Sequence, residues 1–311
     1  MLAYKKLFDD VFEEVEKVIV GQQEMVTQIL SAVLADGNAL VEGYPGLAKT
    51  LSVRTLARIM DLRFSRIQNT PDLMPSDITG TYVLEESNGK REFKFHPGPV
   101  FANVVLADEI NRATPKTQSA LLEAMQEKQV TVGNTTYKLD LPFFVLATMN
   151  PIEQEGTYKL PEAQEDRFLL KIKVTYPSFD EEMEIVNRYT GEDKERKLRV
   201  VVSKEQLLDL QALTRQVPVS SDIKQFIVKL VNETRNRKDI IEYGASPRAS
   251  TGLVLASKAR ALIGGRNHVS IEDVRAMAYP VLRHRIILNF EAERKGLTPD
   301  GAVKLLLDKI R

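Results

Sequence analysis

Residues 43–50 carry the first pattern that points to chemistry. They read Gly-Tyr-Pro-Gly-Leu-Ala-Lys-Thr and stand between the apolar-leaning stretch 38–42 and a helical-looking run, Leu51–Met60. A glycine-rich turn between a strand and a helix presents backbone N–H groups to an anion, and the helix N-terminus favours negative charge there. Lys49 would add a point charge on the outer phosphates, and Thr50 a hydroxyl ligand for Mg²⁺. The octet therefore predicts a site for a nucleoside triphosphate.

Ala48 departs from the strict pattern, which has glycine immediately before the lysine. Because alanine disfavours a left-handed backbone but accepts a negative φ, we expect position 48 to be helical with φ below zero. An ordinary Gly/Pro turn is the alternative interpretation of the octet. The residues expected to bind phosphate are Gly43, Tyr44, Pro45, Gly46, Leu47, Ala48, Lys49, Thr50 and Leu51.

A second pattern is a short apolar run, Val104–Ala107, followed by Asp108 and Glu109. Continuous apolar runs suit strands buried on both faces of a parallel sheet, and such sheets bind ligands at the carboxyl ends of their strands. Asp108 is then placed to hold Mg²⁺ through water, and Glu109 to take a proton from an attacking water. The alternative, two acids that begin a solvated loop, is disfavoured by the phosphate-loop pattern earlier in the chain.

Composition limits the class of protein. The 311 residues are enough for a core of about 170 residues and a second unit. Lys+Arg and Asp+Glu both number 43, so the total charge gives no sign of nucleic-acid binding. The chain has no cysteine, which excludes disulfides, thiolate metal sites and a cysteine nucleophile. Without a signal-peptide pattern or an apolar run long enough to span a bilayer, we expect a soluble, cytoplasmic protein.

The pattern along the chain predicts an α/β domain over residues 1–176 and a helical domain over 177–311. In the first part, apolar runs alternate with helical periodicity, as in βαβ units. The expected strands are 39–42, 64–67, 104–107, 143–148 and 168–174, and the expected helices are 22–34, 51–60 and 115–128. After Pro177 the strand signals fade, and the expected helices are 180–189, 203–214, 220–237, 247–262, 271–277 and 300–310.

Two turn signals interrupt the α/β pattern. Asn88-Gly89 separates two β-type runs and predicts a hairpin over about 82–95. Gly133-Asn134 does the same for a hairpin over about 130–139. One interpretation is that both hairpins are ordinary surface features without a specific role.

Taken together, these segments resemble the MoxR family of AAA+ ATPases. The resemblance runs from about Val20 to about Arg285, and the family carries the alanine found at position 48. It implies a P-loop NTPase fold, a parallel sheet flanked by helices, with a C-terminal all-α lid, and it implies ATP and Mg²⁺ as ligands. The segments that carry it are Gly43–Thr50, Leu106–Ala113, Lys116–Met125, Ala147–Pro151, Pro161–Phe168 and Gly244–Arg248.

The resemblance also implies roles for three polar residues. Asn150 resembles the sensor-1 residue that orients the attacking water, although an Asn before proline can also simply form a turn. Arg167 resembles an arginine finger acting on a neighbouring subunit, the alternative being an intrachain ion pair with Asp166 or Glu165.

Arg248 resembles the sensor-2 arginine. It follows Ser246-Pro247, a good N-cap and first-turn pair. A cation near a helix N-terminus is unfavourable for the helix dipole, which indicates that its position serves phosphate contact instead. Its own or a neighbour's nucleotide could be the target.

Other implied roles concern the adenine and the hairpins. Val20-Gly21-Gln22 resembles the segment that packs on the adenine, with a simple loop-to-helix entry as the alternative. The two hairpins fall where this branch of AAA+ proteins has an insert in helix 2 and a hairpin before sensor 1, which implies partner or substrate handling. Gln68, at the end of the second expected strand, is expected to sense nucleotide by holding Glu109.

The function implied by the resemblance is ATP hydrolysis in a homo-oligomeric ring, a hexamer, that remodels or activates a client protein in a chaperone-like way. The usual partner carries a von Willebrand factor A domain, and no nucleic acid is expected. A magnesium-chelatase-type motor subunit is the first alternative. An enhancer-dependent transcription activator is disfavoured because residues 82–95 lack a Gly-Ala-Phe-Thr-Gly-Ala loop. An ATP-gated scaffold with little turnover is disfavoured by the intact Glu109.

Overall fold

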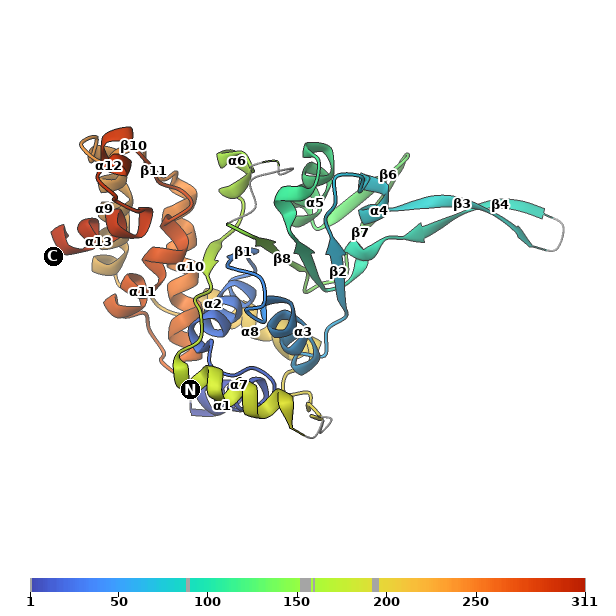
Figure 1. The fold of residues 1–311 in the computed structure, drawn as a ribbon, viewed down its shortest axis with the longest axis horizontal. Coiled ribbons are helices and arrows are strands. Elements are labelled where there is room, and N and C mark those ends of the chain that lie inside the picture. Colours follow the sequence, from blue (N-terminus) through green and yellow to red (C-terminus); the bar gives the residue numbers. More distant parts are fainter. Residues whose placement is uncertain (1, 88–89, 152–157, 159, 192–195, 311) are drawn as a thin grey trace.

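The computed structural model describes residues 2–87, 90–151, 158, 160–191 and 196–310 (Figure 1). Its centre is a five-stranded sheet with the strand order β2-β5-β8-β1-β9, in which all neighbours are parallel. This arrangement confirms the predicted parallel sheet. The strands are β1 (Ala39–Glu42), β2 (Phe64–Gln68), β5 (Val104–Asp108), β8 (Phe144–Met149) and β9 (Leu170–Lys173).

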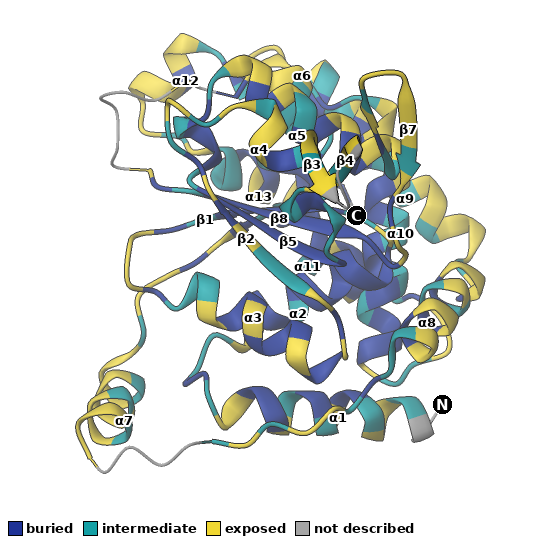
Figure 2. Ribbon diagram, turned by 90° about the vertical axis from the view of Figure 1, so that its right-hand side faces the viewer, coloured by how far each residue is buried: buried dark blue, intermediate teal, exposed yellow. Residues whose placement is uncertain are grey.

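The sheet separates two apolar cores, which explains why its strands read as continuous apolar runs. Val104 and Leu106 of β5 belong to one cluster, whereas Val105 and Ala107 belong to the other. Figure 2 shows the buried strands between helical layers. The first cluster includes α1 (Leu2–Glu16), α2 (Gln23–Leu34) and α3 (Lys49–Ile59), and the second includes α5 (Pro115–Glu127).

The C-terminal part is mostly helical, as expected of a lid. It also contains a short antiparallel pair, β10 (Ile241–Tyr243) and β11 (Ile287–Leu288), whose strands are too short to leave a periodic signal. Within the described residues, no helix is both long and apolar enough to cross a membrane. The helices are α7 (Phe179–Thr190), α8 (Lys204–Gln216), α9 (Ser221–Asn236), α10 (Pro247–Ile263), α11 (Ile271–Leu282), α12 (Phe290–Arg294) and α13 (Pro299–Lys309).

Two hairpins extend from the α/β part over the segments where hairpins were expected. The first, β3 (Gly80–Ser87) with β4 (Lys90–Pro97), projects far from the body in Figure 1. The turn residues Asn88-Gly89 lie outside the described residues. The second pairs β6 (Gln129–Val132) with β7 (Thr135–Lys138). Shorter helical segments are α4 (Pro75–Thr79), α6 (Glu162–Glu165), η1 (Pro99–Phe101) and η2 (Ile110–Arg112).

Candidate nucleotide site

The phosphate loop and the acidic pair lie at the same edge of the sheet. Gly43 follows β1, Asp108 ends β5 and Asn150 follows β8, and β8 lies between β1 and β5. Because these strands are parallel, their carboxyl ends meet at one edge, where such sheets bind ligands. A cavity of about 410 Å³ at this edge is lined by Pro45, Gly46, Leu47, Ala48, Lys49, Thr50, Leu51, Arg66, Asp108, Glu109, Thr148 and Asn150.

Lys49 is held inside the loop. Its Nζ donates to the backbone oxygen of Gly43 and, at 3.2 Å, to that of Tyr44. Lys49 is also the first residue of α3, so the N-terminal N–H groups of the helix open onto the same cavity. The ammonium group and the helix N-terminus together make this end of the cavity favourable for phosphate.

Ala48 does not have the helical conformation with negative φ that the sequence predicted. Its φ is 55° and its ψ is 18°, which is the left-handed conformation. The loop must reverse direction before α3 begins, and it does so at the position that the strict pattern fills with glycine. For a residue with a Cβ this conformation costs roughly 1–2 kcal/mol. The prediction for Ala48 was therefore wrong, and the loop carries local strain.

Asp108 lies at the centre of a polar network and its side chain is 12% exposed. One oxygen, Oδ2, accepts from Arg66 Nε at 3.0 Å and Nη2 at 2.6 Å, and from the Thr50 hydroxyl at 3.5 Å. The other, Oδ1, accepts from the Thr148 hydroxyl. Arg66 thus provides the positive charge that a buried carboxylate needs.

The oxygen donors at this point suit Mg²⁺. Thr50 Oγ1 and Asp108 Oδ2 lie close enough to share one hydrated cation, and Mg²⁺ commonly takes one or two protein oxygens together with water and substrate phosphates. In the described part of the chain, no three carboxylate, histidine or cysteine side chains gather around a metal position.

Both the backbone and the carboxylate of Glu109 are held by hydrogen bonds. Its backbone is left-handed, with a φ of 54°, and its N–H donates to Thr148 Oγ1 at 2.9 Å. Its carboxylate accepts from Gln68 Nε2 at 2.9 Å and from Arg112 Nη1 at 3.2 Å. The contact between Gln68 and Glu109 is the one named from the sequence, and its role in sensing nucleotide stays a prediction.

Sequence reasoning missed Arg66, Arg112 and Thr148. The signal that could have revealed Arg66 is its spacing of two residues from Gln68, because residues 66 and 68 point to the same side of β2. This side becomes functional only through strand pairing, which sets Gln68 beside Asp108.

A second cavity, of about 490 Å³, adjoins the phosphate loop. Val20 and Gln22 line it, and Gly21 lies between them with a φ of 64°, where a Cβ would overlap the Glu181 side chain. Its mixture of apolar walls and a few polar groups suits a purine. The walls that sequence reasoning missed are Val18, Ile19, Tyr176, Pro177, Glu182, Ile185 and Tyr189.

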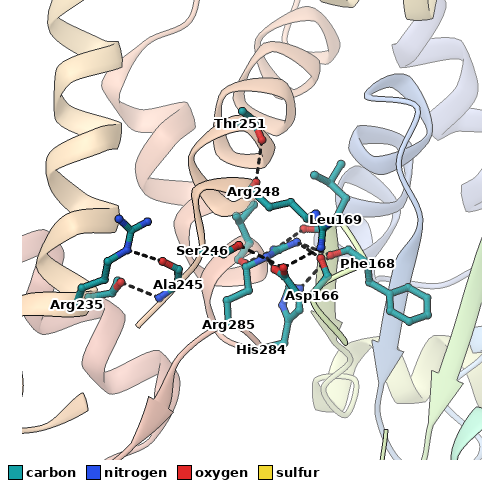
Figure 3. Close-up of polar contacts among 12 residues, drawn as sticks. Asp166, Phe168, Leu169, Arg235, Ala245, Ser246, Arg248, Thr251, His284 and Arg285 are labelled. Atoms are coloured by element: carbon teal, nitrogen blue, oxygen red, sulfur yellow. Dashed lines mark hydrogen bonds and ion pairs between the residues drawn. The ribbon is translucent and has the colours of Figure 1, made fainter. Parts of the chain in front are cut away.

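Arg167 and Arg248 line neither cavity in the described part of the chain. Arg167 is half-buried before β9, and its guanidinium has no hydrogen bond or ion pair with any described residue. The ion pair with Asp166 that was the alternative role for Arg167 is formed by Arg248 instead, at 3.0 Å (Figure 3).

Comparisons with known proteins agree with this geometry. A family model described as "ATPase family associated with various cellular activities (AAA)" matches residues 38–170, and a model described as "AAA lid domain" matches residues 233–304. Chaperone MoxR1 of Mycobacterium tuberculosis (strain ATCC 25618 / H37Rv) is 44% identical over 96% of this chain and 80% of its own length. The uncharacterized protein YeaC of Bacillus subtilis (strain 168) is 43% identical over 96% of this chain and 92% of its own.

A solved structure extends the likeness to three dimensions. A crystal structure from Cytophaga hutchinsonii ATCC 33406 is 46% identical and matches with a TM-score of 0.92 over 100% of this chain and 96% of that one. The likeness to Chaperone MoxR1 spans both the sheet that carries the phosphate loop and the helical lid. The chain therefore belongs to the MoxR family of AAA+ ATPases.

Proposed function

We propose that this protein hydrolyses ATP with Mg²⁺ in the cytoplasm, as a homo-oligomeric ring, a hexamer, that remodels or activates a client protein. One observation carries the catalytic part of this proposal. The lysine, hydroxyl, carboxylates and amide that ATP hydrolysis needs line a single cavity at the carboxyl edge of adjacent parallel strands. These residues are Lys49, Thr50, Asp108, Glu109 and Asn150.

Each of these groups has a role that its position supports. Thr50 and Asp108 would hold Mg²⁺, which supplies charge neutralisation on the phosphates when it is bound. Glu109 takes the proton from the attacking water, and its bonds to Gln68 and Arg112 set the direction of its carboxylate. Asn150 orients that water, and Lys49 stabilises the outer phosphates.

The place of Arg167 supports a role at a neighbouring subunit's nucleotide. Leu169 N–H donates to the backbone oxygen of Asn38 at 2.8 Å, just before β1 begins. The segment leading into β9 therefore lies beside the start of the strand whose other end carries the phosphate loop. Since Arg167 is part of that segment, it is poorly placed to reach phosphates on its own loop.

Arg248 is also displaced from its own nucleotide site. On α10, Arg260 contacts Glu24 at 3.5 Å, next to the segment that lines the adenine-side cavity. Arg248 stands twelve residues earlier (260 − 248), or about 18 Å along the helix axis. We therefore propose that Arg167 and Arg248 both stabilise charge on the nucleotide of the adjacent protomer.

Steady-state phosphate release tests the catalytic proposal. The wild-type protein should hydrolyse ATP, with a specific activity that rises with protein concentration as the ring assembles. Lys49→Ala should lose ATP binding, whereas Glu109→Gln should bind ATP without turnover, because the two residues act on phosphate and on water respectively. Normal hydrolysis by Glu109→Gln would show that Glu109 is not the group that takes the proton from the attacking water.

The client and the partner follow from the family likeness alone. The relative named Chaperone MoxR1 supports a chaperone-like role, and we propose a partner with a von Willebrand factor A domain. A pull-down with Glu109→Gln tests this part. Because that variant stalls with ATP bound, it should retain the client and the partner in ATP and release them in ADP. Equal recovery in both nucleotides would contradict ATP-driven remodelling.

A further inference from the structure

Arg285 ties the helical lid to the segment that carries Arg167. Its guanidinium, only 2% exposed, donates to the backbone oxygens of Phe168 at 2.6 Å and Leu169 at 3.0 Å. It also donates to the Asp166 backbone oxygen at 3.2 Å and, through Nε, to Asp166 Oδ1 at 2.7 Å (Figure 3). One buried lid residue therefore binds the chain on both sides of Arg167.

His284 reinforces this attachment without adding charge. Its Nε2 lies 3.0 Å from the Phe168 backbone oxygen, to which it donates. Complete burial, followed by the nearby Arg285 charge, holds the pKa of His284 well below its usual value, so the imidazole is neutral. The Phe168 carbonyl thus accepts from two lid side chains.

The second oxygen of Asp166 faces the other lid arginine. Asp166 Oδ2 accepts from Arg248 Nη1 at 3.0 Å and from the Ser246 hydroxyl at 3.2 Å. Arg248 sits in the first turn of α10, where the helix dipole repels its charge. Asp166 is the one carboxylate that binds both Arg248 and Arg285 in the described part of the chain. Without it, two guanidinium groups would repel each other there.

The start of α10 is itself fixed. Ala245 donates its N–H to the Thr234 hydroxyl at 2.9 Å, and its carbonyl accepts from Arg235 Nε at 2.8 Å (Figure 3). Gly244 approaches the Thr234 backbone so closely that a Cβ would lie 2.5 Å from its oxygen. The backbone that presents Arg248 is therefore rigidly placed, and the direction of its side chain is set by Asp166.

The geometry points to Asp166 as a positioning residue for both arginines that one protomer presents to the next. It holds Arg248 directly, and its bonds to Arg285 fix the backbone immediately before Arg167. This inference rests on the proposed ATP hydrolysis between protomers. It goes further by making Arg167 and Arg248 one unit whose geometry depends on a carboxylate that touches neither nucleotide nor metal.

Asp166→Asn tests the inference because it removes the charge and keeps the size. We expect a fall in kcat of about tenfold to a hundredfold, as expected for a misplaced catalytic group, with the affinity for a fluorescent ATP analogue unchanged. Arg248→Ala should show the same split. The double variant should lose little more than Arg248→Ala alone, because both changes remove the same unit.

Asp300→Asn is the matched control. Asp300 also joins the lid to the sheet, accepting from Arg283 Nε at 2.9 Å and from Lys173 Nζ at 3.1 Å, but it has no bond to the 166–169 segment. It should keep a near-normal kcat. An equal loss in Asp300→Asn would assign the effect to general loosening of the lid and overturn the inference.

Mixed rings separate positioning from folding or assembly. Lys49→Ala protomers bind no ATP but carry intact Asp166, Arg167 and Arg248 for a neighbour. Mixing them in excess with Asp166→Asn protomers should raise hydrolysis well above the sum of the rates of the two variants alone. A mixture that stays inactive although differently tagged protomers of the two variants co-purify in one ring would overturn the inference.

The remaining outcomes also decide the question. Wild-type kcat in Asp166→Asn, or a loss that disappears at high protein concentration, would overturn the inference while leaving the proposed function intact. Absence of phosphate release from the wild-type protein itself would contradict the proposed function, and this inference with it.

Discussion

Three residues with a Cβ adopt left-handed backbones at the nucleotide site. They are Gln22 (φ 60°), Ala48 (φ 55°) and Glu109 (φ 54°), and each lines at least one of the two cavities. Such conformations are unfavourable for residues other than glycine, and they persist where the surrounding structure holds them. The site therefore keeps its loop geometry at a cost in stability.

Ala48→Gly should therefore stabilise the protein. Glycine adopts a left-handed backbone without the Cβ penalty, and part of that gain is lost to the greater freedom of the unfolded chain. We expect the free energy of unfolding to rise by about 0.5–1 kcal/mol in urea denaturation. Ala57→Gly, inside the helix that Ala48 precedes, is the control and should lower it by at least about 1 kcal/mol, because Ala57 is helical and buried. A loss of stability in both variants would contradict the left-handed conformation of Ala48.

Arg66 should make the stability of the site less dependent on Mg²⁺. Because this guanidinium is the cation bonded to the buried Asp108 carboxylate, Arg66→Gln should leave that charge unpaired. In EDTA we expect the free energy of unfolding to fall by about 1 kcal/mol, a modest loss because Arg66 is half exposed. Adding Mg²⁺ should raise the Tm of Arg66→Gln by more than it raises the Tm of the wild type.

Arg63→Gln is the matched control for Arg66. Arg63 pairs with Asp140 at 3.1 Å, and it precedes the same strand at its other end. Its loss should not change the response of Tm to Mg²⁺. An unchanged Mg²⁺ response in Arg66→Gln would show that Arg66 does not compete with a cation for Asp108.

At this scale, residues that are neighbours in the chain were predictable from motifs. Of the site contacts that form through strand pairing, the one between Gln68 and Glu109 was expected from the family resemblance, whereas the one between Arg66 and Asp108 was not. Lys49 and Thr50 are consecutive, as are Asp108 and Glu109, so a motif places them together before any fold is known. Arg66 reaches Asp108 only because β2 pairs with β5 in a particular register. The φ of Ala48 is set by loop closure, which outweighs the local preference of alanine.

At the scale of elements, prediction succeeded where periodicity was strong. The strands of the sheet are buried on both faces and read as apolar runs, and Thr114 caps α5 by accepting from the Thr117 N–H. The first helix, α1, was missed because charged residues alternate with apolar ones along it. Its buried residues Phe8, Val11 and Val15 share one face that packs into the core.

The two hairpins are joined at their base by an aromatic cluster. Phe95 of β4 stacks on Tyr137 of β7 with ring centroids 4.3 Å apart, and the Tyr82 and Tyr137 hydroxyls lie 2.7 Å apart. Tyr137→Ala should therefore loosen both hairpins, because it removes a stacked pair and a hydrogen bond. We expect the amides of β3 and β4 to exchange hydrogen at least about fivefold faster, because a fall of about 1 kcal/mol in the free energy of local opening predicts that factor.

Tyr137→Phe separates the two contributions, since it keeps the stack and removes only the hydroxyl. It should cause a smaller change than Tyr137→Ala. Tyr243→Ala, at an exposed lid tyrosine, should leave β3 and β4 unchanged. Unaltered exchange in Tyr137→Ala would show that the first hairpin moves independently of the second.

For the whole molecule, the lid and the sheet are joined by continuous packing. One apolar cluster contains Leu170 of β9, Leu30 of α2 and Leu253 of α10, so it extends across the expected boundary near residue 177. Ion pairs add to this, among them those made by Asp166 and Asp300. Because of these contacts, we expect any motion of the lid to carry the segment before β9 with it. The boundary itself stays a prediction, because a continuous core gives no packing break that would mark it.

The buried His284 makes this attachment sensitive to acid. The pKa of His284 is depressed by its burial, so the folded state stays neutral while the unfolded state takes up a proton below its ordinary pKa of 6.5. The stability that this residue contributes is therefore complete above pH 6.5 and is lost as the pH falls towards the folded pKa. Between pH 7.5 and 5.5 this amounts to on the order of 1 kcal/mol.

His284→Gln isolates the pH-dependent contribution of His284 to the free energy of unfolding, because the glutamine amide can donate to the Phe168 oxygen but does not titrate. Urea denaturation at pH 7.5 and 5.5 should show a smaller loss of unfolding free energy in this variant than in the wild type, by on the order of 1 kcal/mol. His268→Gln removes an exposed lid histidine and serves as the control for losing a histidine as such. Carboxylates titrate in all three proteins and cancel in the comparison. Parallel pH dependence of His284→Gln and the wild type would mean that His284 takes up its proton in the folded state, and that the joint between lid and sheet tolerates a buried charge beside Arg285.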